Sequence, residues 1–213
     1  MSSREEQKYQ TRRKLMHAAL TLMLEGSGFG ELSLRGVTRE AGLAPTAFYR
    51  HFKDMEELGL SLVDETFVTL RRMLRDVWRH TEGYRHVIRN SVAVYVEYLQ
   101  TNVEVFSFVV RERHGGTAVL RAAIQRELRY FSMELATAIS PEPRIAHLSE
   151  SDRETATHLI VSTVANFTAD LVDAHLRDDG SLERHAQRAV EELLIITLGI
   201  RLWNQDEDSR VRH

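Results

Sequence analysis

Several common features are missing from this chain of 213 residues, and each absence narrows the possible fold. There is no cysteine, which excludes disulfide bonds and thiolate metal sites and fits a reducing compartment. Only three prolines occur, so long uninterrupted helices are expected. Strand-like alternation is absent, as is any apolar run near the ~18–20 residues of a membrane span. The sequence thus predicts an all-α protein without membrane insertion.

Targeting, catalytic and metal-binding motifs are missing as well. The first residues lack the apolar core of a secretory signal, which predicts a cytoplasmic location. No His-Glu-x-x-His, nucleophile elbow or dinucleotide-binding turn occurs, and no Gly-Lys-Ser/Thr follows the glycines of residues 26–30. These glycines therefore predict a helix end and a connection. Asp170, Asp173 and His175 lie close in sequence, but the ten histidines are scattered. We predict no enzymatic activity, no metal and no cofactor.

Residues 33–53 have the pattern of a helix-turn-helix. Leu34, Val37 and Ala41 share one face of a short helix, and Ser33 can accept hydrogen bonds from its free N–H groups. Gly42 suits the left-handed position after that helix, at which the chain turns. This pattern predicts the first helix of the motif.

The second helix of the motif is expected to begin at Pro45, because the first helical position needs no N–H donor, and to end in Tyr49-Arg50-His51-Phe52. Phe48 and Phe52 are four residues apart and are predicted to point inward. Thr46, Ala47 and Arg50 then lie on the outer face, where short side chains and one arginine fit a DNA major groove.

The charge distribution also favours a nucleic-acid partner for the N-terminal part. Residues 1–53 contain nine Lys and Arg against five Asp and Glu, whereas the remainder contains nineteen against twenty-six. A basic unit on an acidic body is expected when one end meets phosphate. The apolar spacing predicts further helices over about residues 5–25, 54–80, 85–101, 103–113, 117–138, 149–177 and 181–204.

The last helix contains an almost uninterrupted apolar run, residues 193–200. The run is too short to span a membrane, and a helix that is apolar on all sides is buried on all sides. We expect one side to contact the protein's own core and the other a second subunit, in a four-helix bundle formed with the preceding helix. The alternative is the central helix of a monomer. The residues assigned to the dimer contact are Leu193, Leu194, Thr197 and Ile200.

From about residue 12 to residue 62 the sequence resembles the TetR family of repressors. The residues that carry the likeness are Leu32-Ser33-Leu34-Arg35, Glu40-Ala41-Gly42, Pro45 through Asp54, and Glu57-Leu58. The resemblance implies an all-α homodimer that binds a palindromic double-stranded DNA operator. It also implies two domains, with DNA binding in residues 1–53 and ligand binding and dimerisation in residues 54–213.

Ten residues are considered for contacts with DNA. Thr46, Arg50 and Ala47 are candidates for base edges, whereas Lys53 and Ser33 are expected at phosphates and Arg35 at either. The family uses the position of Tyr49 for phosphate, although a core tyrosine packed on the first helix is an alternative. The N-terminal arm contributes Lys8 and Arg12, together with Arg13, unless it is a solvated tail.

A looser likeness connects the rest of the chain with fatty-acid-responsive repressors of the same family. It covers residues 49–65 and residues 111–123, including Arg111-Glu112-Arg113. The resemblance implies control of unsaturated fatty acid synthesis or desaturase genes by long-chain acyl-CoA, with opposite effects of saturated and unsaturated chains. A different lipophile, such as a drug, is the alternative ligand.

An acyl chain needs a long apolar tunnel, and the coenzyme A phosphates need cations at its mouth. The candidate lining residues are Phe67, Leu70, Leu74, Val94, Tyr98, Phe106, Val109, Phe131, Phe167 and Leu171, for each of which an ordinary core position is the alternative. The candidate cations are Arg71, Arg111 and Arg113, with Arg72 and Arg75 nearby.

Overall fold

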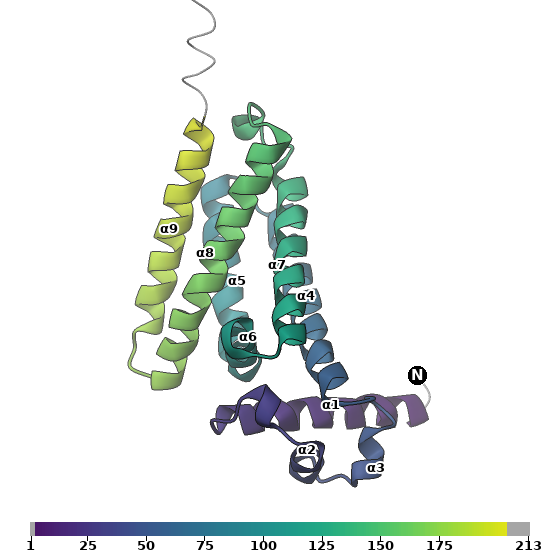
Figure 1. Ribbon diagram of the computed structural model, residues 1–213. Helices are drawn as coiled ribbons and strands as arrows, with labels where there is room; N and C mark the ends of the chain where they lie inside the picture. The colour runs from purple at the N-terminus through teal and green to yellow at the C-terminus, as the bar shows by residue number, and fades with distance from the viewer. Residues whose placement is uncertain (1–2, 204–213) are drawn as a thin grey trace, which may run out of the picture. The chain divides into compact units, whose positions relative to one another are not determined.

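The computed structural model describes residues 3–203, and every regular element in that range is helical, which confirms the predicted fold class. The elements (Figure 1) are α1 (Ser3–Leu24), the 3-10 turn η1 (Phe29–Glu31), α2 (Leu34–Glu40), α3 (Pro45–Phe48), α4 (Met55–His80), α5 (Tyr84–Thr101), α6 (Val103–Gly115), α7 (Ala118–Ile139), the 3-10 turn η2 (Pro143–Ile145), α8 (Glu150–Arg177) and α9 (Leu182–Leu202). No helix in this range is long and apolar enough to cross a membrane.

The helices pack into two compact units. The first unit consists of Met1–Thr69 and Asn102–Gln125, and the second of Leu70–Thr101 and Arg126–His213. Helices α4 and α7 therefore each run from one unit into the other, whereas α6 belongs entirely to the first. The functional division expected at residue 53 remains a prediction.

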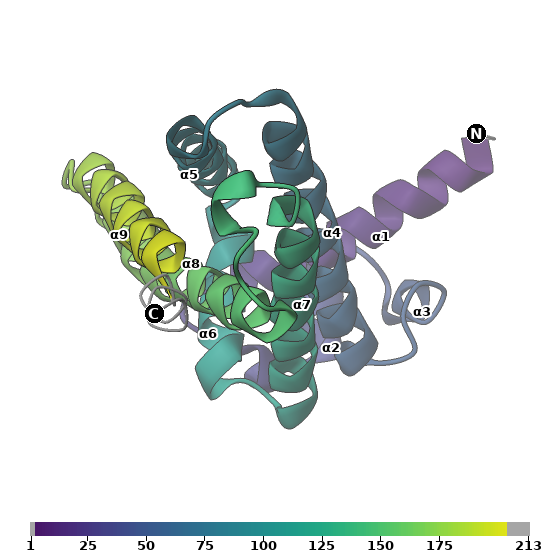
Figure 2. The ribbon, with the colours of Figure 1, turned by 90° about the horizontal axis from the view of Figure 1, so that it is seen from above.

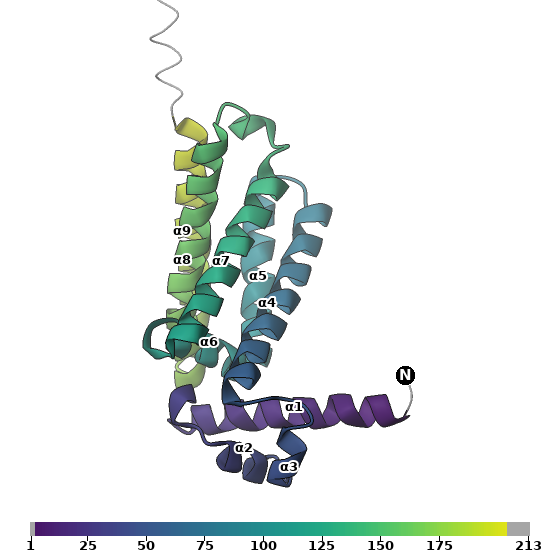
Figure 3. The same cartoon turned by 45° about the vertical axis from the view of Figure 1, so that its right-hand side comes forward.

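In the first unit α1 packs against α2 and α6, and α2 packs against α3 (Figure 3). The helix starts are fixed by local capping, as the sequence predicts. The Ser33 hydroxyl accepts from Gly36 N–H at 3.0 Å, and the Asp54 carboxylate accepts from Glu57 N–H at 2.8 Å. The fully buried side chains of this unit's core are Leu15, Met23, Val37, Phe48, Phe52, Leu58, Val63, Phe108, Leu120 and Ile124.

In the second unit α8 and α9 run side by side, as the view from above shows, and both pack against α5 (Figure 2). Ser149 caps α8 by accepting from Asp152 N–H at 3.1 Å, and Asp152 in turn accepts from the Trp203 indole at the end of α9. The hydrogen bond from the Ser149 hydroxyl is the first cause of the lowered pKa of Asp152. These contacts join the start of α8 to the end of α9.

The structure corrects three expectations. Helix α3 ends at Phe48 and continues as turns to His51, because Arg50 and His51 form i→i+3 bonds to the carbonyls of Ala47 and Phe48. The helical spacing of the apolar residues of α8 predicts that Leu159 is buried, yet it is 50% exposed. Helix α9 is not the central helix of a monomer, since Ile195 and several neighbours face solvent.

Candidate DNA-binding surface, effector core and subunit face

In the helix-turn-helix, buried aromatic side chains hold α3 and the turn after it in place. Phe48 and Phe52 are both buried and their rings contact each other with centroids 5.5 Å apart. Gly42 makes the turn between α2 and α3 with a φ of +67°, in the left-handed region that favours glycine. The side chains of Thr46 and Arg50 are exposed, as expected of residues that meet base edges.

Tyr49 lies at the end of α3 and is 65% exposed, with its ring edge against Phe48. The alternative of a tyrosine buried against α1 is therefore wrong. Ser33, Arg35 and Lys53 are exposed as well. The hydroxyl of Ser33 accepts the Gly36 N–H, so its own proton stays available for an acceptor such as a phosphate oxygen.

Arg12 was predicted to contact DNA, but its side chain makes several contacts within the protein. Its guanidinium donates to the backbone oxygen of His51 at 3.3 Å, lies over the Phe52 ring at 4.5 Å and approaches the Glu65 carboxylate at 3.5 Å. Helix α1 begins at Ser3, so Lys8 and Arg12 stand on a helix and the alternative of a structureless tail does not apply to them. Arg12 connects α1 to the end of α3 and to α4.

His51 was not singled out from the sequence, but it lies among the basic side chains of the DNA-binding unit. Burial of the ring, and then the positive charges of Lys8, Arg12 and Arg50, hold its pKa below the ordinary value. Three cations that act on one imidazole indicate a positive local potential. Such a potential favours the approach of a phosphate backbone.

The residues predicted to line an effector tunnel are mostly buried, but they belong to both units. Phe67, Phe106 and Val109 lie in the first unit, and the other seven lie in the second. Val94, Tyr98 and Val109 are partly exposed, and the other seven are buried. Burial alone does not distinguish residues that line a ligand tunnel from ordinary core residues.

The second unit has a polar centre that sequence reasoning missed. The Thr168 hydroxyl donates to Val164 O at 2.7 Å, so the Tyr95 hydroxyl donates to Thr168 Oγ1 at 2.6 Å. The Tyr95 ring also meets Phe167 edge-on, with centroids 6.4 Å apart. Buried hydroxyls that satisfy one another fix the relative rotation of α5 and α8. No sequence spacing predicts this pair, because the two residues are 73 positions apart.

The outer face of the last helix exposes a row of large apolar side chains. Ile195 is 70% exposed, and Leu198 and Leu202 follow at i+3 and i+7 on the same face. Of the four predicted dimer residues, Leu193 belongs to the protomer's own core, while Leu194, Thr197 and Ile200 are partly exposed. The exposed row could have been found from its helical spacing within the same apolar run.

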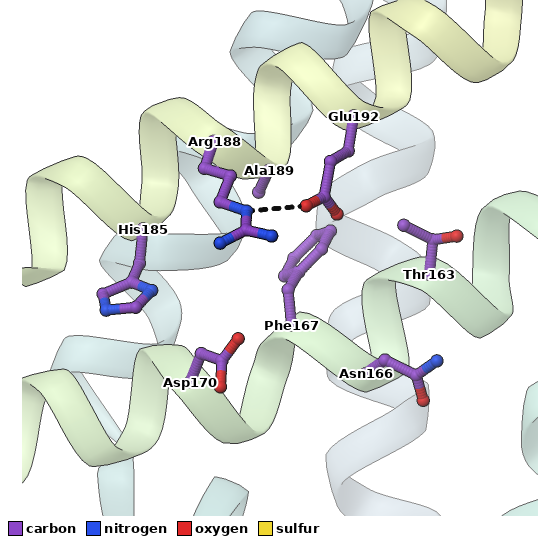
Figure 4. Close-up of a pocket in the computed structure, with 8 residues that line it drawn as sticks. All are labelled: Thr163, Asn166, Phe167, Asp170, His185, Arg188, Ala189 and Glu192. Carbon is purple, nitrogen blue, oxygen red and sulfur yellow. Dashed lines mark hydrogen bonds and ion pairs between the residues drawn. The ribbon is translucent and has the colours of Figure 1, made fainter.

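Beside this row, α8 and α9 enclose a polar groove of about 250 Å³ (Figure 4). Arg188 and Glu192 form an ion pair at 2.9 Å along α9. Asp170 on α8 and His185 on α9 face the groove from opposite walls, and the apolar floor includes Phe167. The groove carries positively and negatively charged side chains, which favours contact with a polar or charged surface of another molecule. Among the residues that the structure describes, no cluster of His, Asp and Glu could hold a metal ion.

Residues 15–62 match the sequence model of the family described as bacterial regulatory proteins, tetR family. This segment is therefore similar to the domain that the family model describes. The match covers α2 and α3 together with the end of α1 and the start of α4.

Solved TetR-type structures share the fold over most of the chain. A putative TetR-family transcriptional regulator from Syntrophomonas wolfei is 14% identical with a TM-score of 0.74, covering 90% of this chain and 96% of that one. The transcriptional regulator FadR from Bacillus subtilis, in complex with stearoyl-CoA, is 18% identical with a TM-score of 0.68, covering 85% and 96%. The fatty acid degradation regulator FadR from Bacillus halodurans is 15% identical with a TM-score of 0.68, covering 84% and 94%. At these identities the likeness establishes the fold.

Three of the arginines considered for a coenzyme A head group already have partners within the protein. Arg71 forms an ion pair with the buried Glu127 and lies 3.9 Å from Glu134. Arg111 donates to the Met23 carbonyl at 2.7 Å in the first unit. The exposed Arg72 and Arg75 extend from α4, Arg75 lying 3.6 Å from Glu134. A head-group role for Arg71 or Arg111 would therefore require the loss of an existing contact.

Proposed function

We propose that the protein is a DNA-binding transcriptional repressor that binds a palindromic operator as a homodimer and changes its operator affinity when it binds long-chain acyl-CoA. The observation that carries the DNA-binding part is the TetR-family match over residues 15–62, together with the exposed outer face of α3. As a regulator of transcription it would act in the cytoplasm.

The division of labour on the DNA follows from side-chain chemistry. Lys53, Tyr49 and Ser33 are exposed donors that suit phosphate oxygens, and phosphate contacts set the position of the domain on DNA. Thr46 projects from α3 and Arg50 from the turn that follows it, where both can meet base edges, and Ala47 suits a thymine methyl group. Lys8 and Arg35 add positive charge at the edges of this surface.

A homodimer is supported by the outer face of α8 and α9. Large apolar side chains at Ile195 and Leu198 lose contact with water when a second copy covers them. A two-fold axis through this face brings the same surface of both copies together, including the polar groove. Two DNA-binding units related by a two-fold axis match a palindrome whose half-sites are about one helical turn or a multiple apart.

The acyl-CoA part of the proposal rests on a structural neighbour and on a sequence resemblance. A TetR-type neighbour of similar fold was solved in complex with stearoyl-CoA, and the chain's own resemblance to the fatty-acid-responsive repressors DesT and FabR points to the same ligand class. We propose that the regulated genes serve unsaturated fatty acid synthesis or desaturation. The alternative is a TetR-type repressor that responds to another lipophile such as a drug, because an apolar core by itself does not select a head group.

A ligand changes operator affinity only if it binds the DNA-competent and the incompetent dimers unequally. Helix α4 begins at Met55, two residues after Lys53, and runs into the second unit, so a change in its tilt reaches the DNA-binding residues. Saturated and bent unsaturated chains fill one tunnel differently, which gives a route to opposite effects.

The deciding experiment is a titration of an operator complex with acyl-CoAs. An operator is first selected from random duplexes by the full-length protein, and its affinity is then measured with palmitoyl-CoA, oleoyl-CoA, free coenzyme A and an uncharged lipophilic drug. A change with the acyl-CoAs alone supports the proposal. No change with either acyl-CoA refutes the ligand assignment and leaves DNA binding intact, whereas failure to select any duplex refutes the regulator itself.

A further inference from the structure

Two adjacent residues near the end of α6 hold the last turn of α1 and the connection from α1 to α2. The first is Arg111, whose guanidinium donates to the backbone oxygen of Met23 at 2.7 Å. Met23 lies in the last turn of α1, where the helix dipole is negative, and its carbonyl also accepts the Gly26 N–H at 3.1 Å. Helix α1 has no basic residue of its own in that turn. Helix α6 therefore supplies the cation that caps α1.

The second residue is Glu112, which is only 3% exposed. Its Oε1 accepts the backbone N–H of Phe29 at 3.2 Å. Its Oε2 is buried and has no hydrogen-bond partner among the described residues. A buried carboxylate oxygen without a partner costs free energy, so this side chain is held in place by its surroundings.

Phe29 is the point at which these contacts converge. Its ring meets Phe108 of α6 edge-on, with centroids 5.7 Å apart, and closely approaches Gly59 of α4, which Leu120 of α7 approaches as well. Phe29 also begins the 3-10 turn η1, which leads directly to Ser33, the N-cap of α2. The position of α2 is thus connected to α6 through three residues of backbone.

We propose that Arg111 and Glu112 form a latch, by which α6 holds the helix-turn-helix in its DNA-binding position and releases it when α6 moves. This inference rests on the proposed function as a regulator and assigns a positioning role to two residues that meet no DNA. It also gives Arg111 a role other than binding a coenzyme A phosphate.

The geometry makes the latch sensitive to small movements. Both contacts come from neighbouring residues of one helix, so a shift of α6 by about 1–2 Å lengthens both beyond hydrogen-bonding distance at once. Helix α6 follows α5 after the single residue Asn102, and α7 continues from the first unit into the second. Rearrangement of the second unit on ligand binding can therefore reach the latch along the chain.

The test uses Glu112→Gln in the full-length protein. Glutamine keeps the shape and a carbonyl acceptor but removes the charge. The matched control is Glu104→Gln, which removes the same charge from the same helix at a partly exposed position. We expect Glu112→Gln to lower the affinity for a selected operator about five- to tenfold, the value of one charge-assisted hydrogen bond, and Glu104→Gln to leave it unchanged.

Hydrogen exchange of individual backbone amides distinguishes a local effect of the substitution from general destabilisation of the protein. Glu112→Gln is expected to speed exchange of the amides of residues 29–33 and to leave that of α8 and α9 unchanged. Arg111→Lys keeps the positive charge. In this variant the amides of residues 29–33 are expected to exchange faster than in the wild type, but by a smaller factor than in Glu112→Gln. If palmitoyl-CoA changes the operator affinity of the wild type, that change is expected to be smaller in Glu112→Gln.

The outcomes separate this inference from the proposed function. A wild-type protein that selects no DNA refutes the regulator, and the exchange measurement then still reports whether Glu112 holds Phe29. A wild type that binds its operator, with Glu112→Gln equal to Glu104→Gln in affinity and in exchange of residues 29–33, overturns the latch and leaves the regulator intact.

Discussion

Replacing Gly116 with alanine is expected to destabilise the protein strongly, whereas the same change at the adjacent Gly115 is not. The backbone of Gly116 has φ −71° and ψ −178°, which any residue can adopt, so conformational freedom is not the reason for glycine here. Space is the reason. A Cβ at residue 116 would overlap the carboxylate oxygen of Glu112 and lie 2.6 Å from its backbone oxygen. At Gly115 nothing lies within 4 Å.

The expected magnitude follows from these contacts. The backbone oxygen of Glu112 cannot move without distorting the last turn of α6, and overpacking of this kind costs about 1–3 kcal/mol. Displacing the carboxylate also removes its hydrogen bond to Phe29, which adds about 1–2 kcal/mol. The sum is about 2–5 kcal/mol, or a fall in Tm on the order of 10 °C for a chain of this size. Alanine at residue 115 is expected to change stability by less than about 1 kcal/mol, in the stabilising direction.

Urea and thermal unfolding of the two variants and the wild type, followed by circular dichroism, measure the difference. All samples need the same protein concentration, because the proposed dimer would make apparent stability depend on concentration. If Gly116→Ala unfolds within about 0.5 kcal/mol of Gly115→Ala, the packing described around Glu112 is wrong.

Three further predictions concern DNA binding, assembly and pH. Lys53→Ala is expected to weaken binding to all duplexes alike and to reduce the slope of affinity against salt by about one, measured by fluorescence anisotropy; a loss confined to one operator sequence would argue against a phosphate contact. Ile195→Glu is expected to yield monomers in analytical ultracentrifugation. The control Met133→Glu changes a similarly exposed residue of α7 and is expected to stay dimeric. A dimeric Ile195→Glu protein would place the subunit contact elsewhere. The pKa of His51 is held below its ordinary value of 6.5, so the unfolded chain takes up this proton first and wild-type stability should fall, relative to His51→Gln, as the pH drops below 6.5. Urea denaturation across that range would contradict this if the two curves ran parallel.

The local features of the helix-turn-helix could be predicted because each depends on a few neighbouring residues. Ser33 and Asp54 cap their helices through N–H groups three residues away, and Gly42 adopts the positive φ that the turn requires. The inward positions of Phe48 and Phe52 follow from helical spacing. The end of α3 was misplaced, because the turns that follow it keep nearly helical hydrogen bonds.

The partners of the charged side chains could not be predicted in this way. Arg12, Arg71 and Arg111 all look like free cations in the sequence, and each is held by a group at least 39 residues away. A long arginine side chain reaches several surfaces, and only the packing of the helices decides which one it meets.

By itself the sequence determined the helical fold class, the helix-turn-helix and the apolar character of the last helix, since these follow from spacing and capping along a single segment. Only the tertiary structure decided which side of that helix stays exposed, with Leu193 buried and Ile195 open to solvent. It alone distinguished Gly116 from Gly115, because the difference lies in where the Glu112 carboxylate is placed. The physical reason is the same in both cases: local propensity acts within one turn of chain, whereas burial and partner choice depend on segments that meet only after folding.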